Sequence, residues 1–232
     1  MTTARLILWD IDHTLIETGG VGSEVFRAAF EQVTGRKIEK LADVTGRTEP
    51  IIFRETLEMY GIEDPGDYFP KFVQTQAKIY RSRADEMRRR GRVLPGAREA
   101  LESLATIPYI HQTVLTGNPR LSAEAKLSIF GLAVLLNGNT GAYGDDDPVR
   151  ANLVNIARQR AREQTGIMFT EKTTVIIGDS PSDVEAALKG GAQIIAVASG
   201  STPPEELRTA GAITVLTDLA DPAAVRRAVT ES

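Results

Sequence analysis

The stretch Leu6-Ile-Leu-Trp-Asp10-Ile-Asp12-His-Thr-Leu15 decides the fold that the sequence predicts. A continuous apolar run that ends in carboxylates is typical of a strand buried on both faces. Side chains at positions i and i+2 of an extended chain point the same way, so Asp10 and Asp12 should face one site at the carboxyl end of this strand. Two like charges held this close need a cation or a shared proton. The alternative is that Asp10 caps a turn and Asp12 caps the next helix.

The composition is that of an ordinary globular protein. The chain has 232 residues, with 27 basic and 31 acidic side chains and a net charge of −4, which gives no general attraction to nucleic acid or to a membrane surface. It has no cysteine, which excludes disulfides and thiolate metal sites. No apolar run is long enough to span a membrane. The N-terminal apolar run is too short for a secretory signal and is interrupted by Asp10. We therefore expect a cytoplasmic protein with no nucleic-acid or membrane partner; the sequence leaves the oligomeric state open.

The segment between the first strand and Arg92 is predicted to be entirely helical. Apolar residues recur at helical spacing from Val21 to Gly35, and further helices are predicted at about 50–60 and 68–90. The last helix carries an arginine cluster that also contains acidic residues and no interleaved aromatic residues. We interpret this cluster as a solvated helix face rather than a nucleic-acid patch.

The rest of the chain alternates strands with helices. Strands are predicted at 111–116, 132–136, 173–177, 194–197 and 213–216, helices at 97–105, 122–130 and 149–163, and a capping box at 202–205. Such alternation indicates a parallel sheet covered by helices on both faces. The predicted fold is therefore α/β: a Rossmann-like parallel-sheet core of residues 1–16 and 93–232, with an inserted all-helical cap domain of residues 17–92.

Three predicted strands end in polar residues, at Asp10, Thr116 and Asp179. Ligands of open parallel sheets bind outside the carboxyl ends of the strands, so these residues and Asp12 should meet there. Several carboxylates without histidine or cysteine favour a hard cation, and Mg²⁺ is the natural candidate. The turn Thr116-Gly117-Asn118 offers a hydroxyl, backbone N–H groups and an amide, which together can cradle an anion.

Two more residues have competing interpretations. Asp183 in Ser180-Pro-Ser-Asp183 fits the cap of the following helix, or it helps to hold the metal, and both roles are compatible. Arg150 begins a helix just after Asp145, Asp146 and Asp147. Spacing alone favours a surface arginine paired with those aspartates.

These segments together resemble the haloacid dehalogenase superfamily over nearly the whole chain. The run Asp10-Ile-Asp12-His13-Thr-Leu15 is similar to its first motif, DxDxT, with His13 where glycine is commoner. Val114–Asn118 is similar to the second motif, and Gly178–Asp183 to the fourth, GDxxxD. Arg150 is the best match to the basic residue of the third motif, which is usually lysine. The helical insert resembles the family's mobile cap, and His13 either contacts the acids or is simply tolerated in its turn.

The resemblance implies a Mg²⁺-dependent phosphomonoester hydrolase. It implies that Asp10 attacks phosphorus to form an aspartyl-phosphate, and that Asp12 protonates the leaving group and then activates water. The implied metal ligands are Asp10, Asp179 and the backbone carbonyl of Asp12, with Asp183 in support. Thr116, Gly117, Asn118 and Arg150 would hold the phosphoryl oxygens. Repulsion between the carboxylates is expected to raise the pKa of Asp12, and a carboxylate at this position argues against dehalogenation.

The substrate expected from the resemblance is a small phosphorylated metabolite, either phosphoglycolate-like or a sugar phosphate. Thr45-Gly-Arg47-Thr48 begins a helix and resembles a specificity segment of the phosphoglycolate phosphatase branch. Arg47 there would reach a carboxylate or a second phosphate, or it is a surface arginine. The alternatives are a phosphomutase of the β-phosphoglucomutase kind, a receiver-type signalling domain, and a family member that binds phosphorylated ligands without hydrolysing them.

Overall fold

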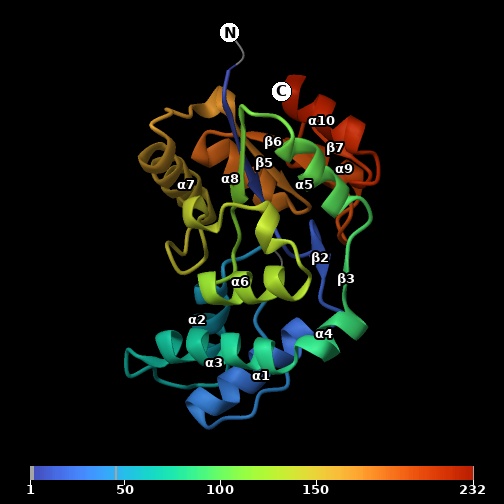
Figure 1. Cartoon of the computed structure of the whole chain (residues 1–232). Helices are drawn as coiled ribbons and strands as arrows, with labels where there is room; N and C mark the ends of the chain where they lie inside the picture. Colours follow the sequence, from blue (N-terminus) through green and yellow to red (C-terminus); the bar gives the residue numbers. More distant parts are fainter. Residues whose placement is uncertain (1–2, 45, 232) are drawn as a thin grey trace.

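A five-stranded parallel sheet forms the centre of the molecule in the computed structural model, which describes residues 3–44 and 46–231 (Figure 1). Its strands are β1 (Arg5–Trp9), β4 (Ile110–Val114), β5 (Thr174–Gly178), β6 (Gln193–Val197) and β7 (Thr214–Leu216). The strand order is β4-β1-β5-β6-β7, and every neighbouring pair is parallel. The carboxyl ends of β4, β1 and β5 are therefore adjacent.

Helices cover both faces of this sheet, as the alternation of strands and helices predicted. The helices are α5 (Ala97–Ala105) and α10 (Pro222–Glu231) on one face, and α7 (Arg150–Thr165) and α8 (Pro181–Gly190) on the other. In β1, Ile7 and Trp9 pack into the first hydrophobic cluster, while Leu6 and Leu8 pack into the second. All four side chains are fully buried, because alternate residues of a strand face opposite sides. A short helix, α9 (Pro204–Thr209), packs beside β7.

Four helices between the first and second halves of the core form what we call the helical insertion. They are α1 (Val21–Thr34), α2 (Glu49–Met59), α3 (Tyr68–Ser82) and α4 (Ala84–Arg90). The chain leaves the core through β2 (Ile16–Glu17) and returns to it through β3 (Arg92–Val93), and these two short strands pair antiparallel. Figure 1 shows these helices grouped at one end of the molecule, with the core helix α6 (Arg120–Ile129) against α3. Within the described residues, the insertion contains no strand between β2 and β3, as predicted.

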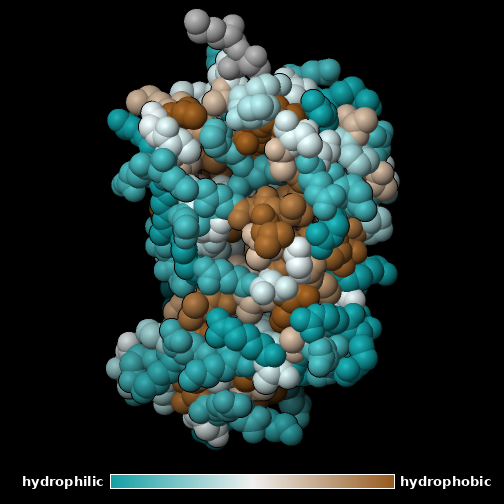
Figure 2. All heavy atoms as spheres, in the orientation of Figure 1, coloured by the Kyte–Doolittle hydropathy of each residue, from teal (hydrophilic) through white to brown (hydrophobic). Residues whose placement is uncertain are grey.

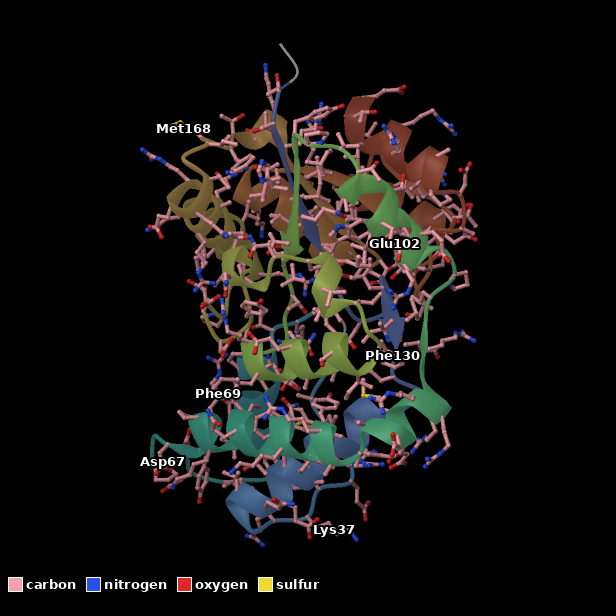
Figure 3. All side chains as sticks on the ribbon, in the orientation of Figure 1. Lys37, Asp67, Phe69, Glu102, Phe130 and Met168 are labelled. Atoms are coloured by element: carbon pink, nitrogen blue, oxygen red, sulfur yellow. The ribbon has the colours of Figure 1, made fainter. Side chains whose placement is uncertain are left out.

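The helical insertion has a hydrophobic cluster of its own. The rings of Phe26, Phe53 and Phe72 lie 4.7–4.8 Å apart in two pairs, and Phe30 packs against the same group. Phe69, labelled in Figure 3, approaches Phe53 at 5.5 Å between ring centroids. Edge-to-face and tilted contacts at these distances stabilise aromatic clusters beyond the burial of their area. The exact division into two domains stays a prediction.

The predicted strand at 132–136 is wrong. This segment contains the 3₁₀ helix η1 (Ala133–Leu135), in which Val134 is 88% exposed while Leu132 is fully buried. The edge of β4 is instead occupied by later backbone: the N–H of Asn137 donates to Gln112, and the N–H of Ala142 donates to Val114. Hydrophobic side chains are visible in the middle of the face shown in Figure 2.

Two helix boundaries also differ from prediction. The helix expected at 68–90 breaks at Arg83, which separates α3 from α4. The capping box expected at Thr202 is absent from the structure, because Pro203 is the N-cap of α9 and makes no side-chain cap. Among the described residues, no helix combines the length and apolar character that a membrane crossing requires.

Candidate active site

The three strand ends bring the predicted acidic residues together. Asp10 follows β1, and its N–H donates to Ile177 of β5 at 2.9 Å, which fixes its position between the strands. Asp179 follows β5 directly. Asp10 and Asp179 are each only 7% exposed. Asp10, Asp179 and the fully buried Asp183 each offer a carboxylate oxygen, and these oxygens all lie within 4.8 Å of one another.

Arg150 lies in this group and not on the surface, so the interpretation from spacing is wrong. Its Nη2 lies 2.9 Å from Oδ1 of Asp10 and 2.5 Å from Oδ1 of Asp183, and 10% of its side chain is exposed. Because α7 packs against α8, the first residue of α7 is carried to the acids. We call Asp10, Asp179, Asp183 and Arg150 the acid site. The aspartates before α7 are used locally: Asp145 accepts from the N–H of Arg120, for example.

Asp183 caps its helix and also contacts Arg150. Its Oδ2 accepts from the N–H and Oγ of Ser180, at 3.1 and 2.6 Å, and its own N–H donates to Oγ of Ser180 at 3.3 Å. This confirms the predicted cap on α8. Its other oxygen accepts from Arg150. Both oxygens of Asp183 are thus held by the protein, so its role in supporting a metal stays a prediction.

Burial dominates the electrostatics of the acid site. Burial, together with the neighbouring carboxylates, raises the pKa of Asp10 to about 8 against the opposing effect of Arg150. Burial also raises the pKa of Asp179 to about 7, with the Asp183 charge adding to it, although Thr14 donates to Oδ1 of Asp179 at 3.0 Å. One arginine does not compensate three buried carboxylates, so this site favours a further cation.

The donor set fits Mg²⁺. Asp10 and Asp179 supply hard oxygen ligands side by side, as this ion prefers, and the described part of the chain brings no histidine into the group of three. Gly200 lies directly over Asp179: a Cβ at this position would lie 2.0 Å from Oδ2. Only glycine leaves that oxygen clear.

Lys126 is a functional candidate that sequence reasoning missed. Its Nζ lies 2.8 and 3.0 Å from the two carboxylate oxygens of Asp12 and 2.6 Å from Oδ1 of Asn118, and only 6% of its side chain is exposed. Nδ2 of Asn118 donates to Asp12 at 2.7 Å. A signal was present: Lys126 stands next to Leu127 among the apolar positions of α6, where a lysine is buried only if it is paired.

Lys126 reverses the expected effect on Asp12. Burial opposes ionisation of Asp12, but the ammonium group and the hydrogen bonds from Lys126 and Asn118 outweigh it and lower its pKa. The expectation of a raised pKa is therefore wrong. The same interaction, together with Tyr80 and Glu49, raises the pKa of Lys126 against the effect of its burial. Asp12 and Lys126 form a charged pair at neutral pH.

The turn after β4 lies at the acid site as predicted. Thr116 is fully buried, and its Oγ1 accepts from Nδ2 of Asn118 at 2.7 Å. A Cβ on Gly117 would lie 2.4 Å from the carbonyl oxygen of Arg47 and 3.2 Å from Nη1 of Arg150. This close approach requires glycine between the core and the helical insertion.

The helical insertion closes over the site and leaves a cavity of about 490 Å³. The N–H of Glu49 donates to the carbonyl of Gly117 at 2.8 Å, and Oγ1 of Thr48 donates to that of Pro148 at 2.7 Å. Asp10, Asp12, Asp179, Arg150 and residues 116–118 line the cavity from the core, and Phe26, Leu41, Val44, Arg47, Glu49, Ile52 and Tyr80 line it from the insertion. This volume suits a small molecule.

Arg47 and His13, whose roles the sequence left open, both line the cavity. Arg47 makes a two-pronged ion pair with Glu55, with both nitrogen–oxygen distances at 2.6 Å. Thr45 lies outside the described residues; α2 begins after Thr48. His13 has a φ of 61°, the left-handed conformation that favours glycine, and its side chain is exposed. The common glycine of the motif thus has a conformational reason at this position.

The chain belongs to the haloacid dehalogenase-like hydrolase family, whose model matches residues 7–188. Solved structures share the fold. A hydrolase from Pseudomonas syringae is 21% identical with a TM-score of 0.66, covering 96% of this chain and 97% of its own. A predicted phosphoglycolate phosphatase from Haemophilus somnus is 19% identical with a TM-score of 0.67, covering 97% and 99%. A proposed β-phosphoglucomutase from Bacteroides vulgatus is 16% identical with a TM-score of 0.66, covering 99% and 89%. A search among curated proteins gives no match.

Proposed function

We propose that the chain is a Mg²⁺-dependent phosphomonoester hydrolase that acts on a small phosphorylated metabolite through an aspartyl-phosphate on Asp10. The observation that carries this proposal is the position of Asp10. Its carboxylate lies in the wall of a cavity between the core and the helical insertion, beside Asp179 and within 2.9 Å of Arg150, with Asp12 two residues further on. A nucleophile, a cation, a pair of metal-type ligands and an acid–base group are thus in one place.

The arrangement supports a two-step reaction. An oxygen of Asp10 forms a bond to phosphorus while the bond to the leaving alkoxide breaks. When bound, Mg²⁺ neutralises charge on the phosphoryl oxygens, which lets a carboxylate approach them. Arg150, the hydroxyl of Thr116 and the backbone N–H of Gly117 hold those oxygens and stabilise the charge that develops. Closure of the helical insertion excludes bulk water.

Asp12 serves as the acid–base group in this proposal. The pair with Lys126 keeps Asp12 ionised at rest, and this is the form that takes a proton from water when the aspartyl-phosphate is hydrolysed. The proton that Asp12 gives to the leaving group in the first step must then arrive with the substrate, since a phosphomonoester monoanion carries one. Lys126 and Asn118 hold the carboxylate in position for both steps.

Replacement of the nucleophile tests the proposal. Asp10→Asn should lower Mg²⁺-dependent phosphate release from p-nitrophenyl phosphate by a factor on the order of 10⁴ or more. Asp85→Asn is the matched control, because Asp85 is exposed and pairs with Arg88 on the surface of α4, away from the acid site. Undiminished turnover by Asp10→Asn, or no Mg²⁺-dependent release by the wild-type protein, would contradict the proposal. The second result would favour a member that binds without catalysis.

A phosphomutase is the second candidate. The pairing of Asp12 with Lys126 favours it, because an Asp12 that stays on Lys126 would activate water poorly and prolong the phosphorylated enzyme. Transfer of phosphate between positions of a sugar without net release of inorganic phosphate distinguishes it from the hydrolase. Membership of the family removes the receiver-type domain from the alternatives.

A further inference from the structure

Every cation that lines the cavity within residues 3–44 and 46–231 is already paired with a carboxylate. Arg150 contacts Asp10 and Asp183, and Lys126 contacts Asp12. Nη1 and Nη2 of Arg47 each donate to a carboxylate oxygen of Glu55 at 2.6 Å. Arg150 is next to the nucleophile and serves the phosphoryl group that is transferred. The remainder of the cavity therefore presents no unpaired positive charge to a second anion.

Glu49 contributes a hydrogen-bond acceptor without a partner to the part of the cavity outside the acid site. Its Oε1 accepts from Nε2 of Gln76 at 2.6 Å, while its Oε2 is buried and has no hydrogen-bond partner. No cation in the described part of the chain forms an ion pair with it; the ammonium of Lys126 is engaged by Asp12 and Asn118. A buried acceptor without a partner is unfavourable, so a donor that enters the cavity would be stabilised there.

Glu49 lines the cavity from the helical insertion, whereas the acids that would hold the phosphoryl group line it from the core, so the side with Glu49 is left for the leaving group. The N–H of Glu49 donates to Gly117, which belongs to the turn that faces the phosphoryl group. The helical insertion lines the cavity with the apolar side chains of Phe26, Leu41, Val44 and Ile52. It also contributes polar side chains, among them Glu17, Ser23 and Arg47. Burial raises the pKa of Glu49 to about 7, against the opposing effects of the nearby Lys126 ammonium and of the hydrogen bond from Gln76. A ligand group beside Glu49 meets apolar side chains and a carboxyl oxygen that has no hydrogen-bond partner.

We propose that the natural leaving group is an alcohol that carries hydrogen-bond donors and no second anion, and that Glu49 accepts from one of those donors. This inference rests on the proposed hydrolase activity. It separates the chain from phosphoglycolate-like and bisphosphate substrates, because a carboxylate or phosphate brought to this part of the cavity would face Glu49 with no free cation.

A series of two-carbon phosphates that differ only at the far end tests the inference. The wild-type protein with Mg²⁺ is assayed at a pH of about 8, where Glu49 is mostly ionised. The substrates are 2-phosphoglycolate (carboxylate), ethyl phosphate (methyl), 2-hydroxyethyl phosphate (hydroxyl) and phosphoethanolamine (ammonium). We expect kcat/KM for the hydroxyl and ammonium compounds to exceed that for 2-phosphoglycolate by at least about tenfold, because like charges are disfavoured across a contact. Ethyl phosphate should fall between them. Preference for 2-phosphoglycolate would overturn the inference while leaving the hydrolase intact.

A substitution then assigns the preference to one side chain. Glu49→Gln should reduce the ratio of kcat/KM for phosphoethanolamine to that for 2-phosphoglycolate by about tenfold, since the amide is neutral and can donate to a carboxylate. Glu58→Gln on the same helix is the control, because Glu58 lies outside the cavity and is 69% exposed. Because the result is a ratio within one variant, a partly destabilised protein still reports it. An unchanged ratio in folded Glu49→Gln would overturn the assignment to Glu49.

If p-nitrophenyl phosphate and all four compounds release no phosphate, the proposed hydrolase fails and this inference falls with it. Release from p-nitrophenyl phosphate without the expected order among the four contradicts the inference alone.

Discussion

The acid site of the core and the arginine-rich face of the helical insertion contain the same kinds of side chain but behave in opposite ways. At the acid site, burial raises the pKa of Asp10 and Asp179 to about 8 and about 7. On the arginine face, which consists of Glu24, Glu86, Arg83 and Arg90, hydrogen bonds from the two arginines lower the pKa of both glutamates to about 2.

Solvent and the number of cations explain this difference. The arginine face has two cations for two carboxylates and stays in contact with water, so each charge is stabilised. The acid site has one cation for three buried carboxylates, so its ionised form is stabilised only when another cation arrives. The first arrangement is complete in itself, whereas the second needs a ligand.

Loss of Arg150 should have the largest effect on stability. Arg150→Met leaves Asp183 and Asp10 buried without their cation, and breaking such a pair costs about 3–5 kcal/mol of the free energy of unfolding. Urea unfolding at neutral pH without metal measures it. Arg162→Met, an exposed position on the same helix, is the control and should change stability by less than about 0.5 kcal/mol. Equal stability of the two variants would show that the carboxylates find relief without Arg150, and the contrast drawn above would fail.

Arg150 also shows where prediction from sequence stops. Strand ends at Asp10, Thr116 and Asp179 were predictable, because apolar runs mark buried strands and parallel strands end on one edge of the sheet. Whether an arginine at a helix start turns inward depends on how α7 packs against α8, and no local pattern contains that information. The family motif suggested Arg150, while its spacing suggested the surface.

The other features that the sequence did not predict also depend on contacts between elements that are distant in the chain. Lys126 reaches Asp12 only because α6 lies between the sheet and α3 (Figure 1). The segment 132–136 is apolar enough for a strand, but the edge of β4 is taken by the backbone of Asn137 and Ala142 instead. Residues of the helical insertion were predicted as helices almost throughout, because helical periodicity and glycine stops are local signals. Sequence therefore predicted elements and strand ends, and missed the contacts made between elements.

The response of stability to pH and Mg²⁺ should be intermediate in size. The pKa values of Asp10 and Asp179 are raised in the folded state, so between pH about 4 and about 8 the folded protein holds more protons than the unfolded chain. The metal-free protein should therefore lose stability as pH rises through this window. Mg²⁺ should raise the melting temperature more at pH 8 than at pH 5.5, by about 5 °C, because the carboxylates are then free of protons.

Thermal unfolding in EDTA and in excess Mg²⁺ at the two pH values measures this difference. Asp179→Asn removes one ligand and one titrating group, so its Mg²⁺ response should be small and nearly independent of pH. An equal Mg²⁺ effect at both pH values in the wild-type protein would indicate that the acid site is not where the ion binds.

A substitution on the arginine face should have the smallest effect on stability. Glu24 accepts from Arg83 and Arg90 at 2.5 and 2.6 Å, yet 35% of its side chain is exposed and water screens these charges. Glu24→Gln should therefore cost only about 0.5–1 kcal/mol in the free energy of unfolding at neutral pH, and less in high salt. The folded-state pKa of Glu24 is lowered, so its contribution is present above the ordinary glutamate pKa and disappears as pH falls toward about 2. Glu31→Gln, exposed on the same helix, is the control for urea unfolding. A loss as large as that of Arg150→Met would mean that the number of ion pairs, and not their burial, sets the contribution of charge in this protein.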